Sequence, residues 1–208
     1  MPFTSRKHFI GIMVKRAFDF SLGLIALLLV LPLMALVALL VYLEDGSPII
    51  FRQTRVGKNG CLFEIYKFRT MVKNAEQLQA LVEQRDAHGN RLHKIKDDPR
   101  VTRIGRILRR FSLDELPQLF NVLAGTMSLV GPRPEVPHLV ERYEPWQYKR
   151  FAVPPGMTGW WQINGRSDRP MHLHTEDDLY YIQNYSIWLD LQIILKTVWV
   201  VIIGKGAY

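Results

Sequence analysis

Cysteine is nearly absent from this chain. Cys61 is the only cysteine among 208 residues, so no intrachain disulfide can form and no thiol-based metal cluster can be built. The sequence also lacks a P-loop, a Rossmann glycine fingerprint and a His-Glu-x-x-His zinc signature. These absences exclude the classes of nucleotide-binding protein that use those loops, and the zinc proteases that use that signature.

Acidic residues are fewer than basic ones. Lysine and arginine number 27, aspartate and glutamate 19, and the formal net charge is +8. This balance suits an anionic partner, which could be lipid head groups, nucleotide phosphates or nucleic acid, and charge alone does not choose among them. The length suits one domain with a sizeable core better than two full domains.

Charge is missing altogether from Phe20 to Leu43. Roughly 20 consecutive apolar residues can cross a bilayer as a helix, so this segment predicts a membrane helix, with membrane lipids as partners. A cleaved signal peptide is disfavoured, because the apolar run is too long and no small-residue cleavage site follows it. The alternative is a helix buried in a protein core.

The flanks of the apolar segment bear on its topology. Both flanks are basic, with Arg6, Lys7, Lys15 and Arg16 before the segment and Arg52, Arg55, Lys58, Lys67 and Arg69 after it. Basic residues near a membrane helix prefer the cytoplasmic side, and a straight span can satisfy only one flank. Pro32 can bend the helix. We therefore predict a re-entrant helix that keeps both flanks cytoplasmic, with a straight span as the alternative.

Short elements follow the apolar segment. Strands are predicted at 48–51 and 63–68, and helices at 75–85, at 101–110 and from Leu113 to about Leu123, closed by Gly125. Residues 101–110 form a basic amphipathic helix of the kind that lies on an anionic membrane, although a helix packed on a core fits the pattern nearly as well. An apolar helix near the C-terminus is interrupted by Asp190 and Lys196, which favours an interfacial or core-packed helix over a second crossing.

These elements predict an α/β fold in which a small membrane-associated catalytic domain carries a proline-broken membrane helix and interfacial amphipathic helices. We expect residues 1–45 to form the N-terminal segment and membrane helix. Residues 46–208 should form the catalytic domain, folded as one unit with that helix.

The tetrapeptide Ser112–Glu115 contains the most informative acidic pair. Its plain interpretation is a capping box, in which Ser112 caps a helix and Glu115 reaches back. The same position would keep the carboxylate of Asp114 ionised for nucleophilic attack, while Glu115 could help bind a divalent cation. Arg109, just upstream, could pair with phosphate oxygens.

Two later segments could contact a nucleotide or its phosphates. Gly131–Pro134 is a stiff turn that presents Arg133, which could be aimed at a phosphate, or could simply be an exposed loop arginine. Residues 155–166 combine glycines, amides and aromatics, including Thr158, Gln162 and Arg166. Their composition suits close approach to a nucleotide and equally suits a glycine-rich turn beside core tryptophans.

Six motifs in order resemble the bacterial sugar transferase family, the monotopic phosphoglycosyl transferases that act on polyprenyl phosphate. The resemblance runs from about Val14 to the C-terminal tyrosine. The motifs are Lys15-Arg16-Ala17-Phe18-Asp19, the proline-broken apolar helix, Tyr66-Lys67-Phe68-Arg69-Thr70-Met71, Ser112-Leu113-Asp114-Glu115-Leu116-Pro117-Gln118-Leu119, Ser128-Leu129-Val130-Gly131-Pro132-Arg133-Pro134 and Gly156-Met157-Thr158-Gly159.

The resemblance implies a chemistry. Asp114 would attack the β-phosphate of a UDP-sugar, releasing UMP, and polyprenyl (undecaprenyl) phosphate would then take the phosphosugar. Asp114 and Glu115 would be catalytic and would bind Mg²⁺, or Glu115 would instead assist the second step. Substrate binding would fall to Lys67, Arg69, Arg109, Arg133, Thr158, Gln162, Arg166 and Asp178, although the four basic residues match family positions that serve either phosphate binding or site structure.

The resemblance also implies a place in the cell. The protein would sit in the bacterial inner membrane with its catalytic domain on the cytoplasmic face, in the first membrane step of polysaccharide or glycoconjugate assembly. No nucleic acid would be needed, and the chain would be a minimal catalytic version of the family. The competing hypothesis is a non-catalytic basic adaptor that gathers anionic lipid or nucleic acid. The transferred sugar and the oligomeric state cannot be deduced from the sequence.

Overall fold

The computed structural model describes residues 6–78, 98–164 and 174–203 of the chain. The helices and strands, in order, are α1 (Arg6–Asp45), β1 (Ile50–Val56), η1 (Lys58–Gly60), β2 (Leu62–Phe68), α3 (Arg103–Arg110), η2 (Leu113–Glu115), α4 (Gln118–Ala124), β3 (Ser128–Val130), α5 (Pro137–Val140), η3 (Gln147–Ala152), β4 (Gly156–Thr158), α6 (Trp160–Ile163), α7 (Thr175–Gln183) and α8 (Ile187–Ile203). This mixture of helices and small sheets confirms the predicted α/β class.

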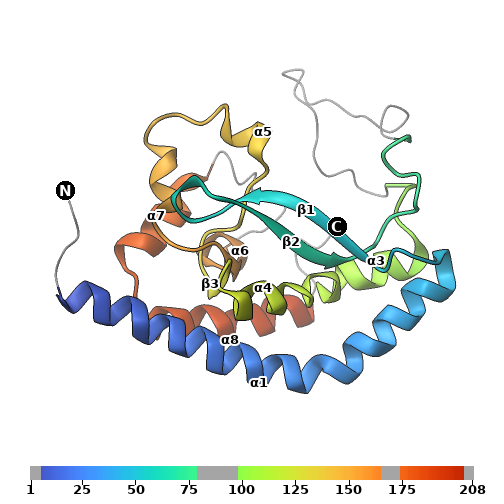
Figure 1. The fold of residues 1–208 in the computed structure, drawn as a ribbon, viewed down its shortest axis with the longest axis horizontal. Helices are drawn as coiled ribbons and strands as arrows, with labels where there is room; N and C mark the ends of the chain where they lie inside the picture. The colour runs from blue at the N-terminus through green and yellow to red at the C-terminus, as the bar shows by residue number, and fades with distance from the viewer. Residues whose placement is uncertain (1–5, 79–97, 165–173, 204–208) are drawn as a thin grey trace.

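The long helix α1 is bent. It runs for 40 residues without a break and contains one proline, Pro32. Figure 1 shows that its two halves meet at an angle and that the rest of the molecule lies on the concave side of the bend. A proline inside a helix removes a backbone hydrogen bond and is a common cause of such a bend.

The outer face of α1 is apolar and exposed. Leu29 is 76% and Leu43 70% exposed. Among the described residues α1 is the one helix long and apolar enough to cross a membrane, with a mean hydropathy of 3.2 in its most apolar window and only 22% of that window buried. A helix buried in a protein core would be covered, so the core-helix alternative does not hold and membrane association is indicated.

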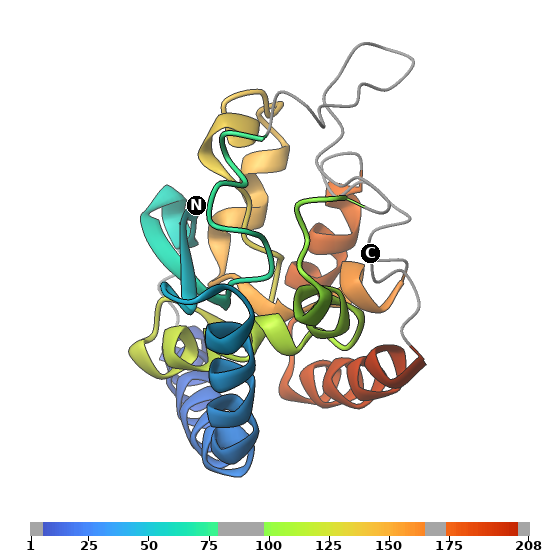
Figure 2. The same ribbon diagram turned by 90° about the vertical axis from the view of Figure 1, so that its right-hand side faces the viewer.

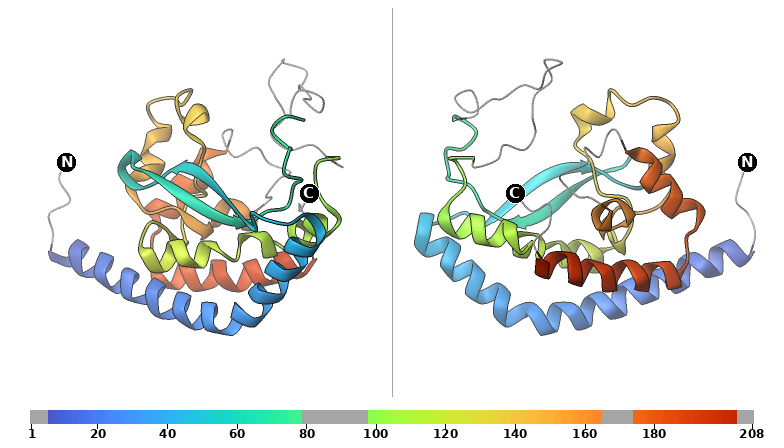
Figure 3. Two further views of the ribbon diagram at one scale, coloured as in Figure 1. Left: turned by 45° about the vertical axis from the view of Figure 1, so that its right-hand side comes forward. Right: turned by 180° about the vertical axis from the view of Figure 1, so that it is seen from behind.

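Helix α8 lies on the same side of the molecule as α1, beneath the strands (Figures 2 and 3). Its residues Leu189 and Ile193 are buried, whereas Trp188, Leu195 and Trp199 are 71%, 72% and 66% exposed. The predicted C-terminal helix is therefore confirmed, with one face in the core and an apolar face exposed next to that of α1.

Two small sheets lie above these helices. Strands β1 and β2 form an antiparallel hairpin, with Ile50 opposite Phe68 and Val56 opposite Leu62, and Asn59 takes a positive φ in the turn between them. Strands β3 and β4 pair in parallel. Strand β1 continues past its predicted end at Phe51 to Val56. The polar residues after Phe51 alternate in exposure along the hairpin, so they continue the strand.

The apolar core joins α1 to the rest of the chain. Leu27, Met34 and Val37 of α1 are buried in one cluster with residues of β2, α4 and α8. Arg16 of α1 also donates to the carbonyl oxygens of Val122 and Leu123 at 2.5 and 2.7 Å, at the end of α4. These contacts fit the expectation that the helix and the catalytic domain fold as one unit, although the predicted boundary between residues 45 and 46 stays a prediction.

A buried ion network joins the two helices that lie beneath the strands. Lys15 of α1 lies 2.8 Å from Asp19 and 2.8 Å from Asp190 of α8, and Tyr181 donates to Asp190 at 2.8 Å. All four side chains are buried. Asp190 therefore interrupts the apolar pattern of α8 in order to pair with α1.

Two predicted helices are wrong in part. Residues 75–78 form turns rather than the start of a helix, and 79–85 lie outside the described residues. The helix predicted from Leu113 is divided into η2 and α4, because Pro117 cannot donate a backbone hydrogen bond and starts a new helix. Helix α4 is closed by Gly125, as predicted, and this glycine has a φ of 85°.

Helix α3 is shorter than the predicted amphipathic helix. It begins after Thr102, whose hydroxyl accepts from the amide of Gly105, and the carboxylate of Glu44 accepts from the amides of Arg103 and Ile104. Glu44 thereby ties the end of α1 to the start of α3. Leu108 is buried in the core, while Ile107 is 52% exposed. The helix thus uses one apolar face for the core and leaves other apolar side chains uncovered.

Candidate active site

The acidic pair lies in the turn η2, between α3 and α4. Ser112, before the turn, has a φ of 54° and makes no side-chain cap hydrogen bond. The capping-box interpretation is therefore wrong. An N-cap residue has an extended backbone, and from the left-handed backbone conformation Ser112 cannot direct its hydroxyl to the first amides of the helix. The side chains of Asp114 and Glu115 are instead available for contacts outside the turn.

Glu115 is held by two cations from different elements. Its Oε1 accepts from Nζ of Lys67, on β2, at 2.7 Å and from the guanidinium of Arg133, after β3, at 2.8 Å. Burial alone would raise the pKa of Glu115, but the charges and hydrogen bonds of Arg133 and Lys67 outweigh burial and hold the pKa well below its usual range. Glu115 is therefore ionised and orders two basic side chains.

Asp114 has no such partner. Its carboxylate is partly exposed and makes no hydrogen bond or ion pair with any described residue. Burial raises the pKa of Asp114, opposed by the charge of Lys67 and aided by that of Glu115. The expectation that a helix terminus would lower this pKa is wrong, since η2 is a single short turn and desolvation dominates. What remains is a half-buried carboxylate among basic side chains.

Arg109 stands beside the acidic pair. Its Nε donates to the hydroxyl of Thr70 at 3.0 Å, and its charge acts on that of Asp114. Helix α3 comes this close to Thr70 because Gly105 has no side chain, and a Cβ there would overlap the backbone of Thr70. Arg109 is thereby fixed near Asp114, as its predicted role in phosphate binding requires.

Arg69, predicted to bind substrate, has its contacts elsewhere. Its guanidinium donates to the carbonyl oxygens of Asp45 and Gly46 at 3.0 and 2.6 Å and pairs with the carboxylate of Asp45 at 3.3 Å. Basic side chains bind favourably to the carbonyl groups that lack a hydrogen-bond partner at the C-terminus of a helix. Arg69 therefore caps the end of α1, and a substrate contact by this residue stays a prediction.

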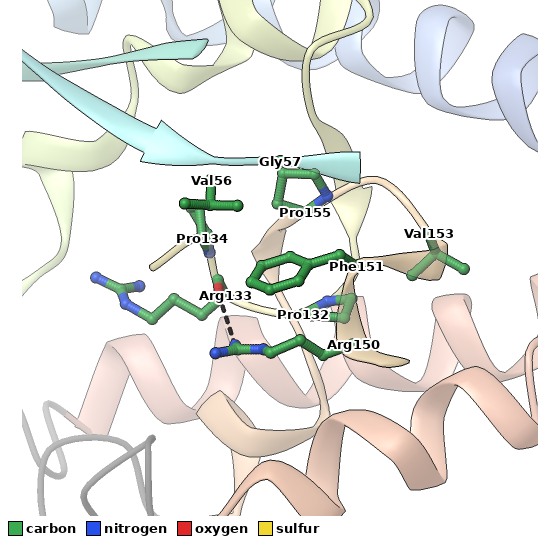
Figure 4. Close-up of a pocket in the computed structure, with 9 residues that line it drawn as sticks. All are labelled: Val56, Gly57, Pro132, Arg133, Pro134, Arg150, Phe151, Val153 and Pro155. Atoms are coloured by element: carbon green, nitrogen blue, oxygen red, sulfur yellow. Dashed lines mark hydrogen bonds between the residues drawn. The ribbon is translucent and has the colours of Figure 1, made fainter. Parts of the chain in front are cut away.

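Arg133 is positioned by a buried arginine. Figure 4 shows the side chain of Arg133 pointing away from Arg150, whose guanidinium donates to the backbone carbonyl of Arg133 at 2.8 Å. Arg150 in turn pairs with Asp178 at 2.6 Å and donates to the hydroxyl of Tyr143. Asp178, predicted to bind substrate, is buried in this ion pair, so its observed role is to fix Arg150, and any substrate contact stays a prediction.

The glycine-rich segment packs against the turn that bears Arg133. A Cβ at Gly156 or Gly159 would overlap the backbone of Gly131, so these glycines serve close backbone packing. Thr158 shares a hydrogen bond of 2.6 Å with Thr197 on α8. The structure does not bring Thr158 into contact with the acidic pair, and its substrate role stays a prediction.

Gln162 and Arg166 complete the predicted set. The side chain of Gln162 is buried, and its amide nitrogen and oxygen have no partner among the described residues. Arg166 lies outside the described residues. The predicted substrate contacts of both residues stay predictions.

Two residues that the sequence did not single out line a pocket next to Glu115. Arg55 of β1 and Gln118 of α4 lie around it together with Lys67 and Arg133. Gln118 belongs to the motif that starts at Ser112, but nothing in its spacing marks it as a ligand. In the sequence Arg55 stands out only as part of the basic flank of the membrane helix. Four elements form the pocket, so the sequence of any one of them does not predict it.

The acidic pair offers part of a metal site. Within residues 6–78, 98–164 and 174–203, no group of three or more His, Cys, Asp or Glu side chains is placed to hold a metal. Magnesium is commonly held by one or two carboxylates together with substrate phosphates and water. The unpartnered carboxylate of Asp114 fits that pattern, whereas one oxygen of Glu115 is already occupied by two cations.

The exposed apolar helix α1 indicates a protein that associates with membranes. The acidic pair among basic side chains is typical of an enzyme that acts on phosphate groups. The chain belongs to the family described as bacterial sugar transferase, which it matches over residues 10–204. The sequence resemblance is thereby confirmed, and membership in a transferase family disfavours the adaptor hypothesis.

Two of its relatives are named for different sugars. Undecaprenyl-phosphate galactose phosphotransferase of Salmonella typhimurium is 44% identical over 205 residues, which cover 94% of this chain and 42% of that protein. Undecaprenyl-phosphate glucose phosphotransferase of Komagataeibacter xylinus is 43% identical over 209 residues, covering 93% and 37%. Exopolysaccharide production protein ExoY of Sinorhizobium fredii is 41% identical over 203 residues, covering 96% and 90%. The chain thus spans less than half the length of some relatives and nine-tenths of another.

Proposed function

We propose that this protein transfers a sugar-1-phosphate from a UDP-sugar to undecaprenyl phosphate and releases UMP. The observation that carries the proposal is the contrast within the acidic pair: Asp114 is half-buried and has no hydrogen bond or ion pair with the described residues, while Glu115 orders Lys67 and Arg133 beside it. The names of two relatives contain undecaprenyl phosphate and a sugar phosphotransferase activity. The reaction would begin polysaccharide or glycoconjugate assembly.

In the first half-reaction, a carboxylate oxygen of Asp114 attacks the β-phosphorus of the donor. The bond from that phosphorus to the oxygen bridging the two phosphates breaks, and the electron pair leaves on UMP. A sugar-phosphate remains bound to Asp114 as an acyl phosphate. Lys67, Arg133 and Arg109 surround this carboxylate and would stabilise the negative charge on the phosphoryl oxygens.

In the second half-reaction, an oxygen of undecaprenyl phosphate attacks the phosphorus of the acyl phosphate. The bond to Asp114 breaks, the carboxylate is regenerated, and the lipid-linked sugar diphosphate leaves with the membrane. The lipid phosphate is confined to the membrane surface, and the exposed apolar face of α1 would hold the protein at that surface.

Magnesium would be held by Asp114, with Glu115 close by, and would neutralise charge on the donor diphosphate when bound. The chain's own contribution to charge neutralisation comes from Lys67 and Arg133, which Glu115 keeps in place. Glu115 is thus a residue that positions cations.

The membrane topology that we propose is re-entrant. The two halves of α1 rise on the same side of the bend as the strands (Figure 3), and basic residues flank both ends. A helix that dips into one leaflet and returns keeps both basic flanks on the cytoplasmic face. The catalytic domain would then lie on the cytoplasmic side of the inner membrane, with the exposed apolar faces of α1 and α8 in contact with lipid.

The function is tested by turnover of defined substrates. Detergent-solubilised protein with Mg²⁺ and undecaprenyl phosphate is given a panel of UDP-sugars, and UMP is measured. We expect UMP release with one or a few of these sugars and transfer of label from the sugar to the lipid. Because relatives named for galactose and glucose are similarly related to this chain, the panel must contain both. Absence of UMP with every sugar in the panel would overturn the proposal.

A further inference from the structure

The pocket beside Glu115 contains more basic and donor groups than the two cations that bind this carboxylate. Its lining comes from β1, β2, α4 and the turn after β3, and consists of Arg55, Ile65, Lys67, Gln118, Arg133 and Pro134. Lys67 and Arg133 face Glu115 at 2.7 and 2.8 Å. Two of the lining residues therefore connect the pocket to Glu115.

Two buried donors on this lining lack a partner. Nε2 of Gln118 and Nε of Arg55 make no hydrogen bond with any described residue, and Gln118 is only 2% exposed. Buried N–H groups without an acceptor are costly and rare in native proteins. Two of them, from different elements and on one pocket, indicate an acceptor that binds there.

The charges around the pocket show what kind of acceptor it is. Burial and the charge of Arg133 together lower the pKa of Arg55 to about 10, against the opposing charges of Glu135 and Glu115. Arg55 and Arg133 thus repel each other across the pocket. An anion would relieve this repulsion and accept from both unpartnered donors, whereas a neutral hydroxyl would do only the second.

The geometry points to an oxyanion subsite in which Arg55 and Gln118 bind a phosphoryl oxygen of a substrate. The inference rests on the proposed function, since it assigns the pocket to the same reaction. The phosphoryl group belongs either to the diphosphate of the nucleotide-sugar or to the phosphate of the lipid acceptor. Both present the same oxygens to the pocket, and the two half-reactions distinguish them.

Anion binding can be tested without turnover. The probe is inorganic pyrophosphate, and the readout is the Tm of the solubilised protein with and without it. We expect pyrophosphate to raise the Tm of the wild type, and Gln118→Met and Arg55→Met to lose at least half of that rise. Without pyrophosphate, Gln118→Met should have an unchanged or higher Tm, because it removes an unpartnered buried donor. Arg52→Met, on the exposed part of the same strand, and the exposed Gln183→Met are the matched controls.

A second variant keeps the test decisive if Gln118→Met does not fold. Gln118→Glu has nearly the same shape and places its own carboxylate among the cations of the pocket. It should raise the Tm without pyrophosphate and show little further rise with it. A full pyrophosphate response in either Gln118 variant and in Arg55→Met would overturn the proposal. A lowered Tm of Gln118→Met with an intact response would also overturn it, since the amide would then be structural.

The half-reactions identify the source of the phosphoryl group. If the donor occupies the subsite, Gln118→Met raises at least fivefold the UDP-sugar concentration that gives half the maximal rate of the single-turnover UMP burst with donor alone. If the lipid phosphate occupies it, UMP release with donor alone is unchanged and the KM for undecaprenyl phosphate rises by a similar factor. No change in either the half-maximal UDP-sugar concentration or the KM for undecaprenyl phosphate would contradict the proposal. Failure of the proposed function would look different, because wild-type protein would then release no UMP while the pyrophosphate test would still give an answer.

Discussion

Asp114 and Glu115 are neighbours in the chain, but only Glu115 is bound by the surrounding cations. Its Oε1 accepts from Lys67 and Arg133, whereas the carboxylate of Asp114 makes no hydrogen bond or ion pair with the part of the chain that the structure describes. The same cations act on Asp114 at longer range. Glu115 therefore organises the positive charge, and the carboxylate of Asp114 is not engaged by it directly.

The first prediction concerns Asp114→Asn. This variant should lose UMP release by at least a thousandfold, because an amide cannot act as the nucleophile. It should keep its membrane association and have an unchanged or slightly higher Tm, since the substitution removes a charge that burial disfavours. UMP assays and thermal unfolding of the same preparation test both parts. The exposed Glu141→Gln is a charge-matched control, and retention of wild-type turnover in Asp114→Asn would reject covalent catalysis by this residue.

The second prediction concerns the pH dependence of the first half-reaction. Burial raises the pKa of Asp114 above the ordinary aspartate value of 3.8, and only the ionised form attacks. UMP release with donor alone should therefore fall on the acid side at a higher pH than an ordinary aspartate would give. Lys67→Met should move this acid limb further up, because the charge of Lys67 lowers the pKa of Asp114. An acid limb at or below pH 3.8 in the wild type would contradict the assignment.

The third prediction concerns the stability that Glu115 provides. Glu115→Gln should reduce the free energy of unfolding by about 2 kcal/mol, because Lys67 and Arg133 lose a charged acceptor. The folded-state pKa of Glu115 lies below its ordinary value, so its contribution is present above that ordinary value and disappears as the pH falls through the lowered one. Denaturant unfolding at neutral and acid pH measures this difference. An equal loss for the exposed control Glu141→Gln would show that the contacts of Glu115 add no stability.

The fourth prediction concerns the buried network between α1 and α8. Lys15→Met should destabilise the protein by about 3 kcal/mol or more, because Asp19 and Asp190 would remain buried without their shared cation. Thermal unfolding of solubilised protein tests this, with the exposed Lys149→Met as the control. Adding Asp190→Asn to Lys15→Met should restore part of the loss. A Lys15→Met protein as stable as the wild type would mean that this network does not join the two helices.

The fifth prediction concerns membrane topology. Cys61, in the hairpin after α1, is exposed and provides a natural probe of one flank. Lys7→Cys in a Cys61→Ser background probes the other flank. In intact cells, both thiols should resist an impermeant reagent added outside and react after the membrane is opened. Labelling of only one flank from outside would establish a straight span.

Part of the fold could be predicted from local patterns. The charge-free run, the hairpin glycines and the glycine after α4 each specify a local structure through hydrophobic length or backbone conformation. The left-handed backbone conformation of Ser112 and the division of the helix at Pro117 could not be predicted, because the residues Ser112–Glu115 also fit a capping box. The bend of α1 follows from Pro32, but its direction depends on packing against the rest of the chain.

The site was predictable only where one motif contains the chemistry. Asp114 and Glu115 are adjacent, so their pairing needs no tertiary structure. The pocket formed by Arg55, Gln118 and Arg133 joins segments far apart in the sequence, and no local pattern reports such a meeting. Similarly, a basic residue in a family motif does not reveal whether it faces a phosphate or, like Arg69, the end of a helix.

The most direct measurement is mass spectrometry of the protein mixed with Mg²⁺ and its UDP-sugar in the absence of lipid acceptor. We predict a mass increase equal to one sugar-phosphate, located on Asp114 by peptide analysis and lost when undecaprenyl phosphate is added. UMP produced under turnover conditions with no such adduct on Asp114 would contradict the covalent mechanism.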